Sequence, residues 1–211
     1  MLVRILEDPN NAESSFECVN VVPFGFLNEI NYKHQLDGSS SDLVKAGRLS
    51  ESLGGTTIFA SVSNNLGIKK LSAFVFCGAK LVSICDMNDG GEKYSAAFGY
   101  NILDFGKEKF GVIVGADLFC PDAVKALSLC GCVAIIDLYE DFYEKKAKNA
   151  AEFYSFVYGI DFIAAGKGKS YYYNSSGTGM EIENGKPFCS SGRKVFKEIK
   201  QKRSGAIILR E

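Results

Sequence analysis

The sequence is poor in the residue types that build metal sites and membrane spans. It has one histidine, His34, among 211 residues, and its Cys130-Gly131-Cys132 pair has neither zinc-site spacing nor a second pair to complete a ligand set. No apolar run approaches the about 18 residues that cross a bilayer, and the first residues lack a secretory hydrophobic region. We therefore expect a cytoplasmic protein with no metal, no cofactor and no membrane partner.

The charge balance and the cysteine usage exclude two further classes. With 24 basic and 25 acidic residues the net charge is −1, so the chain has no electrostatic footprint for nucleic acid. Seven cysteines are an odd number, and most lie in apolar segments, which suits reduced, buried thiols better than a disulfide framework. The composition, 46% hydrophobic and 23% charged, predicts one domain over residues 1–211.

The stretch Lys109 to Ile136 has the pattern of a parallel-sheet crossover. A buried strand is expected at Phe110 to Val114, a turn at Gly115 to Asp117, a helix starting near Pro121, and a second apolar strand at Cys132 to Ile136. In such units the backbone donors after a strand and the start of the following helix converge. The turn at Gly115 is therefore the place where a functional site is expected.

Periodicity and turn residues predict the other elements. Two helices are expected, at Ser41 to Leu53 and at Glu144 to Tyr158. Strands are expected at Met1 to Leu6, Cys18 to Pro23, Thr56 to Val62, Leu71 to Cys77, Leu81 to Met87 and Asp161 to Ala165.

The residue sequence of the central turn resembles a motif of one protein family. Gly-Val-Ile-Val-Gly-Ala-Asp-Leu-Phe-Cys-Pro-Asp, from Gly111 to Asp122, is similar to the nucleophile elbow of the carbon-nitrogen hydrolases, which include nitrilases, amidases and glutaminase domains. In that pattern a catalytic cysteine stands where this chain has Gly115. The resemblance therefore implies the family fold without its nucleophile.

The other two catalytic positions of that family are also replaced. The family places its general base, a glutamate, after an apolar pair and a proline, and here Phe24 follows Val21-Val22-Pro23. Its catalytic lysine ends the strand that here ends at Met87. Glu92 stands at the position of a second, supporting glutamate.

A later segment resembles the glutaminase domain of glutamine-dependent NAD synthetases. Residues 160–188, IDFIAAGKGKSYYYNSSGTGMEIENGKPF, carry this likeness. In that domain they imply a hairpin, with strands at Met180 to Ile182 and Pro187 to Cys189 and a type I′ turn at Asn184-Gly185.

The resemblance implies an α/β fold, a four-layer α-β-β-α sandwich of the nitrilase type. It is abridged at the N-terminus, because only Glu7 to Glu17 separate the first two strands. It also implies a homodimer packed through the helices near residues 122–130 and 144–158.

Two functions are compatible with these residues. The first is a catalytically degenerate protein that binds a small amide-like ligand or a protein partner, with an apolar, partly closed pocket at positions 24, 87 and 115. The second is a carbon-nitrogen hydrolase with a relocated nucleophile, Cys120 or Cys85, for which Glu92 or Asp117 would be the base. The pocket residues that distinguish them are Glu92, Asp117 and Cys120.

Overall fold

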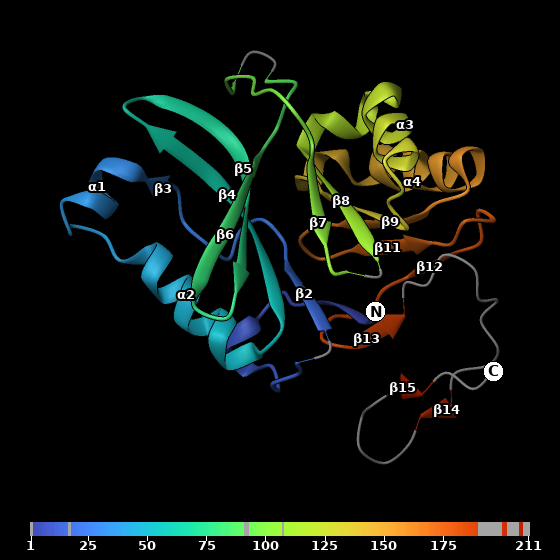
Figure 1. Cartoon of the computed structure of the whole chain (residues 1–211), viewed down its shortest axis with the longest axis horizontal. Helices are drawn as coiled ribbons and strands as arrows, with labels where there is room; N and C mark the ends of the chain where they lie inside the picture. The colour runs from blue at the N-terminus through green and yellow to red at the C-terminus, as the bar shows by residue number, and fades with distance from the viewer. Residues whose placement is uncertain are drawn as a thin grey trace.

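The computed structural model describes residues 2–16, 18–90, 93–106 and 108–189, together with the short strands β14 (Lys200–Gln201) and β15 (Ile207–Ile208), which pair with each other. Two β-sheets lie face to face, with α1 and α2 outside one sheet and α3 and α4 outside the other (Figure 1). This is the α-β-β-α sandwich that the sequence predicted.

The first sheet combines a parallel part and an antiparallel part. Its order is β13-β1-β2-β4-β5-β6, with β3 added beside β4. Strands β1, β2 and β4 run parallel, whereas β4, β5 and β6 form an antiparallel meander. The bounds are β1 Leu2–Ile5, β2 Cys18–Val22, β3 Ile30–Asn31, β4 Thr56–Asn65, β5 Ile68–Cys77, β6 Lys80–Asp86 and β13 Pro187–Cys189.

The second sheet has a parallel centre and antiparallel edges. Its order is β12-β11-β10-β9-β8-β7, and β8, β9 and β10 are parallel. The bounds are β7 Asn101–Asp104, β8 Lys109–Val114, β9 Ala134–Leu138, β10 Asp161–Ala165, β11 Ser170–Tyr173 and β12 Gly179–Glu181.

Four α-helices and three 3-10 turns occur in the described part of the chain. They are α1 Tyr32–Leu36, α2 Asp42–Leu53, α3 Pro121–Leu129, α4 Glu144–Tyr158, η1 Pro9–Asn11, η2 Gly115–Phe119 and η3 Asp141–Tyr143. None of these helices combines the length and the apolar character of a membrane-crossing helix.

Three apolar clusters hold the layers together. One lies between the sheets and takes side chains from both, such as Val21 and Val75 from the first and Val114 and Ile163 from the second. The other two lie under the helices, one beneath α3 and α4 and one beneath α2. Alternate side chains of each central strand therefore face opposite layers, which explains why these strands read as continuous apolar runs.

The central crossover forms as expected. Strand β8 leads into η2, Pro121 is the first residue of α3, and β9 returns parallel to β8. On α3 the buried side chains are Ala123, Val124 and Leu127.

The N-terminal abridgement is also present. The described residues between β1 and β2 form only η1, with no α-helix. The outer face of β1 and β2 is instead filled by Arg4, which donates to Asn20 Oδ1 at 2.8 and 2.6 Å and to the Glu13 carbonyl at 2.6 Å. Burial lowers the pKa of Arg4, and these acceptors compensate for its lost hydration.

The predicted hairpin at Asn184-Gly185 is wrong. The strand at Gly179–Glu181 pairs with β11 in the second sheet, whereas Pro187–Cys189 pairs with β1 in the first. The turn between them is held by the first sheet, because Gly185 N–H donates to the Ile5 carbonyl at 2.7 Å and Asn184 Oδ1 accepts the Glu7 N–H at 2.8 Å. These bonds make the segment a crossing between sheets.

Candidate functional site

Three chain segments place the predicted catalytic positions around the core between the sheets. Phe24 follows β2, Met87 follows β6, and Gly115 follows β8. Met87 is a buried member of the inter-sheet cluster, and Phe24 is a half-buried residue packed against that cluster. Met87 and Gly115 are in contact, whereas Phe24 borders the same inter-sheet cluster from the end of β2. These positions carry a thioether, a backbone without a side chain and an aromatic ring.

Gly115 has no room for a side chain. Its φ is +61°, a left-handed conformation that L-residues adopt at a cost. A Cβ atom on Gly115 would lie 2.7 Å from Met87 Sδ and 3.0 Å from Leu71 Cδ1. The space of a nucleophilic side chain is therefore already filled by Met87.

The backbone donor next to Gly115 is engaged by the same side chain. Ala116 N–H donates to Met87 Sδ at 3.2 Å. A backbone N–H at the start of a turn is the kind of donor that can stabilise an oxyanion. Here it is paired with a weak sulfur acceptor, so Met87 occupies both the side-chain space and the donor.

Asp117 is a structural carboxylate in this fold. It is 2% exposed and accepts the backbone N–H groups of Asn88 and Asp89 at 2.9 Å, together with the Asn88 side-chain amide at 3.2 Å. Burial raises its pKa, and these hydrogen bonds oppose the rise. Its oxygens hold the loop after Met87, so they are not directed at a substrate.

A second buried carboxyl, Asp137, was not singled out from the sequence. It lies in β9 at 0% exposure, and neither of its oxygens has a hydrogen-bond partner in the described part of the chain. Burial is the larger cause and the negative charge of nearby Asp117 the smaller cause that raise the pKa of Asp137 well above its ordinary value. The sequence feature that could have identified Asp137 is the presence of an acidic residue inside the apolar run from Val133 to Leu138.

The two candidate cysteines do not meet the predicted pocket residues in a reactive arrangement. Cys85 is buried in the inter-sheet core, where burial raises its pKa to about 12. Cys120 lies on the helix side of the second sheet beside Tyr100, whose pKa is raised to about 12 by burial and then by Cys120. Glu92 lies outside the described residues.

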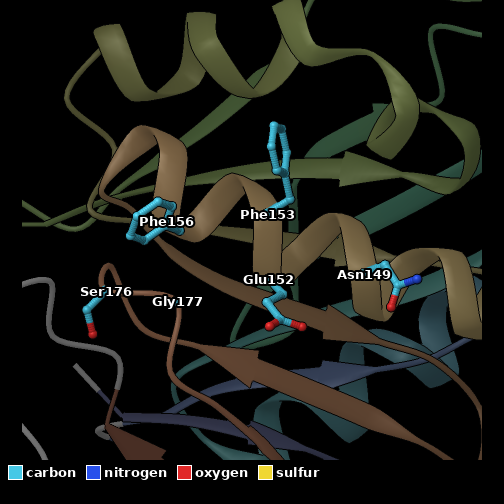
Figure 2. A pocket seen from close by; sticks show the side chains of 6 residues that line it. All are labelled: Asn149, Glu152, Phe153, Phe156, Ser176 and Gly177. Carbon is cyan, nitrogen blue, oxygen red and sulfur yellow. The ribbon is translucent and has the colours of Figure 1, made fainter.

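Surface cavities occur in the described part of the chain, and two of them are candidate ligand sites. One, of about 300 Å³, is bordered by Phe24 and by residues from the ends of both sheets: Glu7, Asp8, Pro23, Gly25, Phe26, Lys167 and Asn184. The other, of about 460 Å³, lies on the outer side of α4 and is lined by Asn149, Glu152, Phe153, Phe156, Ser176 and Gly177 (Figure 2). Within the described ranges, no three histidine, cysteine or carboxylate side chains come together as metal ligands.

Comparisons with known proteins support the fold. No family model and no curated protein matches the sequence. Among solved structures, glutamine-dependent NAD+ synthetase from Acinetobacter baumannii matches with a TM-score of 0.62 and 13% identity, over 81% of this chain and 38% of that one. The chain thus spans well under half of that synthetase.

Smaller relatives match over more of their length. An amidase from Nesterenkonia sp. AN1, with the acetamide moiety of fluoroacetamide added covalently at its active site cysteine, gives a TM-score of 0.66 at 12% identity, over 86% of both chains. Saccharomyces cerevisiae Nit3, a branch 10 member of the nitrilase superfamily, gives 0.63 at 13% identity, over 85% of this chain and 75% of that one. Identities this low establish the shared fold alone.

Proposed function

We propose that this chain, which has the fold of the nitrilase superfamily, does not hydrolyse carbon-nitrogen bonds and acts by binding a small molecule or a protein partner. Thiol-based acyl transfer needs a nucleophile, a base within hydrogen-bond reach and a group that stabilises the developing negative charge. At the corresponding positions this chain has Gly115, Phe24 and Met87, none of which can perform these roles.

The observation that carries the proposal is the fit of Met87 against Gly115. The sulfur lies where a side chain on residue 115 would begin, and it accepts the N–H of Ala116. Substrate attack at this turn would need that space and that donor. An amide therefore has no place to be attacked unless Met87 moves away.

The competing function is hydrolysis by a relocated cysteine. A thiolate is the reactive form of cysteine, and the raised pKa of Cys85, about 12, keeps that thiol protonated. For Cys120 the predicted base Asp117 already accepts hydrogen bonds from residues 88 and 89. These contacts favour the binding role over relocated catalysis.

The test is ammonia release from purified full-length protein. Glutamine, simple amides and nitriles are offered as substrates, with Cys120→Ser as a paired sample. We expect no release above the rate without protein. Release that disappears in Cys120→Ser would instead establish the relocated nucleophile.

We also propose that the protein forms a homodimer through the outer face of α4. Phe153 and Phe156 project from this helix (Figure 2), with 58% and 70% of their surface exposed. Leu129 at the end of α3 and Phe142 in η3 are exposed as well. Aromatic residues gathered on one face are typical of subunit interfaces.

A further inference from the structure

The cavity beside Phe24 joins loops from both sheets. Glu7 and Asp8 follow β1, Pro23 to Phe26 follow β2, and Lys167 lies in the loop between β10 and β11. Strands β1 and β2, which are parallel in the first sheet, and strand β10, which is parallel to β9 in the second, thus all end at this cavity. Loops at the carboxyl ends of parallel strands are the usual position of ligand sites in α/β folds.

The walls of the cavity are fixed by hydrogen bonds between the loops. Glu7 Oε1 accepts the N–H of Gly168 at 3.1 Å, and the N–H of Glu7 donates to Asn184 Oδ1 at 2.8 Å. The Tyr139 hydroxyl donates to the Lys169 carbonyl at 2.6 Å. A site that is already ordered loses less entropy when a ligand binds.

Lys167 brings a positive charge to this cavity and forms no direct ion pair with the carboxylates Glu7 and Asp8 that also line it. No ion-pair partner of Lys167 occurs in the part of the chain that the structure describes. Its side chain crosses over Gly25, where a Cβ atom would lie 3.2 Å from Lys167 Cδ and 3.5 Å from Nζ. Gly25, with φ +101°, therefore leaves the room in which the lysine reaches the first sheet.

The other polar groups offer one further donor and one acceptor. Asn184 uses its side-chain oxygen on the Glu7 N–H, so its NH₂ group remains able to donate. Glu7 uses Oε1 on Gly168, and its Oε2 remains able to accept. Asp8 contributes less, because both of its oxygens already accept hydrogen bonds from Asn10 and Asn11.

The remaining wall is apolar and aromatic. Phe24 packs against the inter-sheet cluster, whereas Phe26 packs against the cluster under α2 and stacks on Phe59 at 6.0 Å between ring centroids. Pro23 completes this side. The volume of about 300 Å³ is at the lower end of the range for ligand sites, so the ligand is small.

From this arrangement we infer that the cavity binds a free α-amino acid with an apolar side chain. Its carboxylate would be held by Lys167 and the Asn184 NH₂ group, its ammonium group by Glu7, and its side chain by Phe24 and Phe26. A simple anion would be repelled by Glu7 and Asp8 and a simple cation by Lys167, whereas a zwitterion can place each of its charges beside the opposite one. This inference deepens the proposed binding role by naming the ligand class, and it does not depend on the state of the turn at Gly115.

The test is ligand-observed NMR and calorimetry on the full chain with L-phenylalanine and L-leucine. N-acetyl-L-phenylalanine lacks the ammonium group, and 2-phenylethylamine lacks the carboxylate. We expect both analogues to bind at least about tenfold more weakly than L-phenylalanine, because each loses one charge-assisted interaction. L-glutamine, whose side chain cannot be hydrogen-bonded by the aromatic wall, should also bind more weakly.

Variants assign the contacts. Lys167→Met should weaken L-phenylalanine about tenfold or more without weakening the cation 2-phenylethylamine, from which it removes a repulsion. Glu7→Gln, which keeps the acceptor for Gly168, should weaken L-phenylalanine without weakening the anion N-acetyl-L-phenylalanine. Lys169→Met is the matched control, because Lys169 lies in the same loop but pairs with Glu144 at 3.5 Å. It should bind like the wild type.

Three results would overturn the inference: no binding of either amino acid at millimolar concentration, binding that survives both Lys167→Met and Glu7→Gln, or L-glutamine binding as tightly as L-phenylalanine. Ammonia release measured on the same samples reports separately on hydrolysis. Failure of the ligand assignment and failure of the non-catalytic role are thus distinguishable.

Discussion

Met87 and Gly115 are fitted to each other: the methionine sulfur lies 2.7 Å from the point where a Cβ on residue 115 would be. Real Cβ atoms do not approach a sulfur so closely, so any larger residue at position 115 requires Met87 to move. The two residues lie 28 positions apart in the sequence, directly after strands of different sheets, and each restricts which residue the other position can hold.

This relationship predicts non-additive effects on stability. Gly115→Ala should lower the free energy of unfolding by about 2–4 kcal/mol, through left-handed backbone strain and the contact with the sulfur. In a Met87→Ala background the contact is absent, so the same change should cost only about 1–2 kcal/mol. Urea unfolding of the wild type, both single variants and the double variant measures the coupling.

Gly159→Ala is the matched control for that cycle. Gly159 has φ +60°, and a Cβ there would meet nothing within 4 Å, so the variant reports backbone strain alone. Additive effects at positions 87 and 115, or equal costs at positions 115 and 159, would contradict the fitted contact.

Because Asp137 is buried without a hydrogen-bond partner in the described part of the chain, we expect its protonation at acidic pH to stabilise the folded protein. Its pKa is raised in the folded protein, so the folded state holds the proton more tightly than the unfolded chain does. The contribution of Asp137 to the free energy of unfolding should therefore be greatest below the unfolded pKa of about 4, and it should fall by about 1.4 kcal/mol per pH unit until the folded pKa is reached.

Asp137→Asn should remove this decline and be more stable than the wild type at pH 7. Thermal unfolding followed between pH 3 and pH 8 gives the measurement, with the exposed Asp141→Asn as a control that should keep the wild-type profile. A wild type whose stability does not fall relative to Asp137→Asn as the pH rises would contradict a neutral Asp137.

Thiol labelling should separate the cysteines by exposure. Cys77 and Cys130 are exposed, whereas Cys85 and Cys132 are buried, with pKa values raised by burial to about 12 and about 11. Iodoacetamide at pH 8, followed by peptide mapping, should modify the exposed pair first, because the thiolate is the reacting species. Denatured protein provides the reference in which all thiols react. If Cys85 were labelled as fast as Cys77 in the folded protein, its thiol would be accessible and reactive, and Cys85 would again be a candidate nucleophile.

The proposed dimer contact on the outer face of α4 predicts a concentration-dependent dimer. Phe156→Asp should shift the protein to the monomer in analytical ultracentrifugation, because a buried carboxylate is costly at a subunit contact. Phe98→Asp is the control, since Phe98 is a fully exposed phenylalanine on a different segment. A wild-type protein that sediments as a 23.0 kDa monomer at micromolar concentration would rule the interface out.

Periodic segments of the fold were predictable from the sequence. The helix at residues 144–158 has the predicted bounds, and its buried side chains include Ala147 and Ala151. The crossover around α3 was predictable because a buried strand, a turn and a proline at the helix start leave few alternatives. Strand β7 was missed, since its two apolar residues, Ile102 and Leu103, are too few to define a period.

The sequence predicts where short strands form better than it predicts which strands they pair with. The strands at 179–181 and 187–189 were expected, but their pairing depends on hydrogen bonds between Asn184, Gly185 and the end of β1. An Asn-Gly pair favours a tight turn and does not specify which sheet each strand joins.

The contacts around the candidate site could be predicted from the sequence only in part. The residues at 24, 87 and 115 could be aligned with catalytic positions from local motifs. The side of the second sheet on which Cys120 lies could not be predicted, because η2 turns the chain toward the helices within a few residues. The unpaired state of Asp137 also depends on its surroundings, which no local pattern specifies.

The pairing of β1 with β13 has a consequence for the order in which the chain is synthesised. Leu2 lies opposite Cys189, so the N-terminal edge of the first sheet leaves the ribosome long before its neighbour exists. Until then β1 is a free edge with unpaired backbone groups, which is a template for association with other chains. Completion of that sheet therefore awaits the synthesis of residues 187–189, and a nascent chain stalled before residue 187 would expose a strand that β13 covers once it is made.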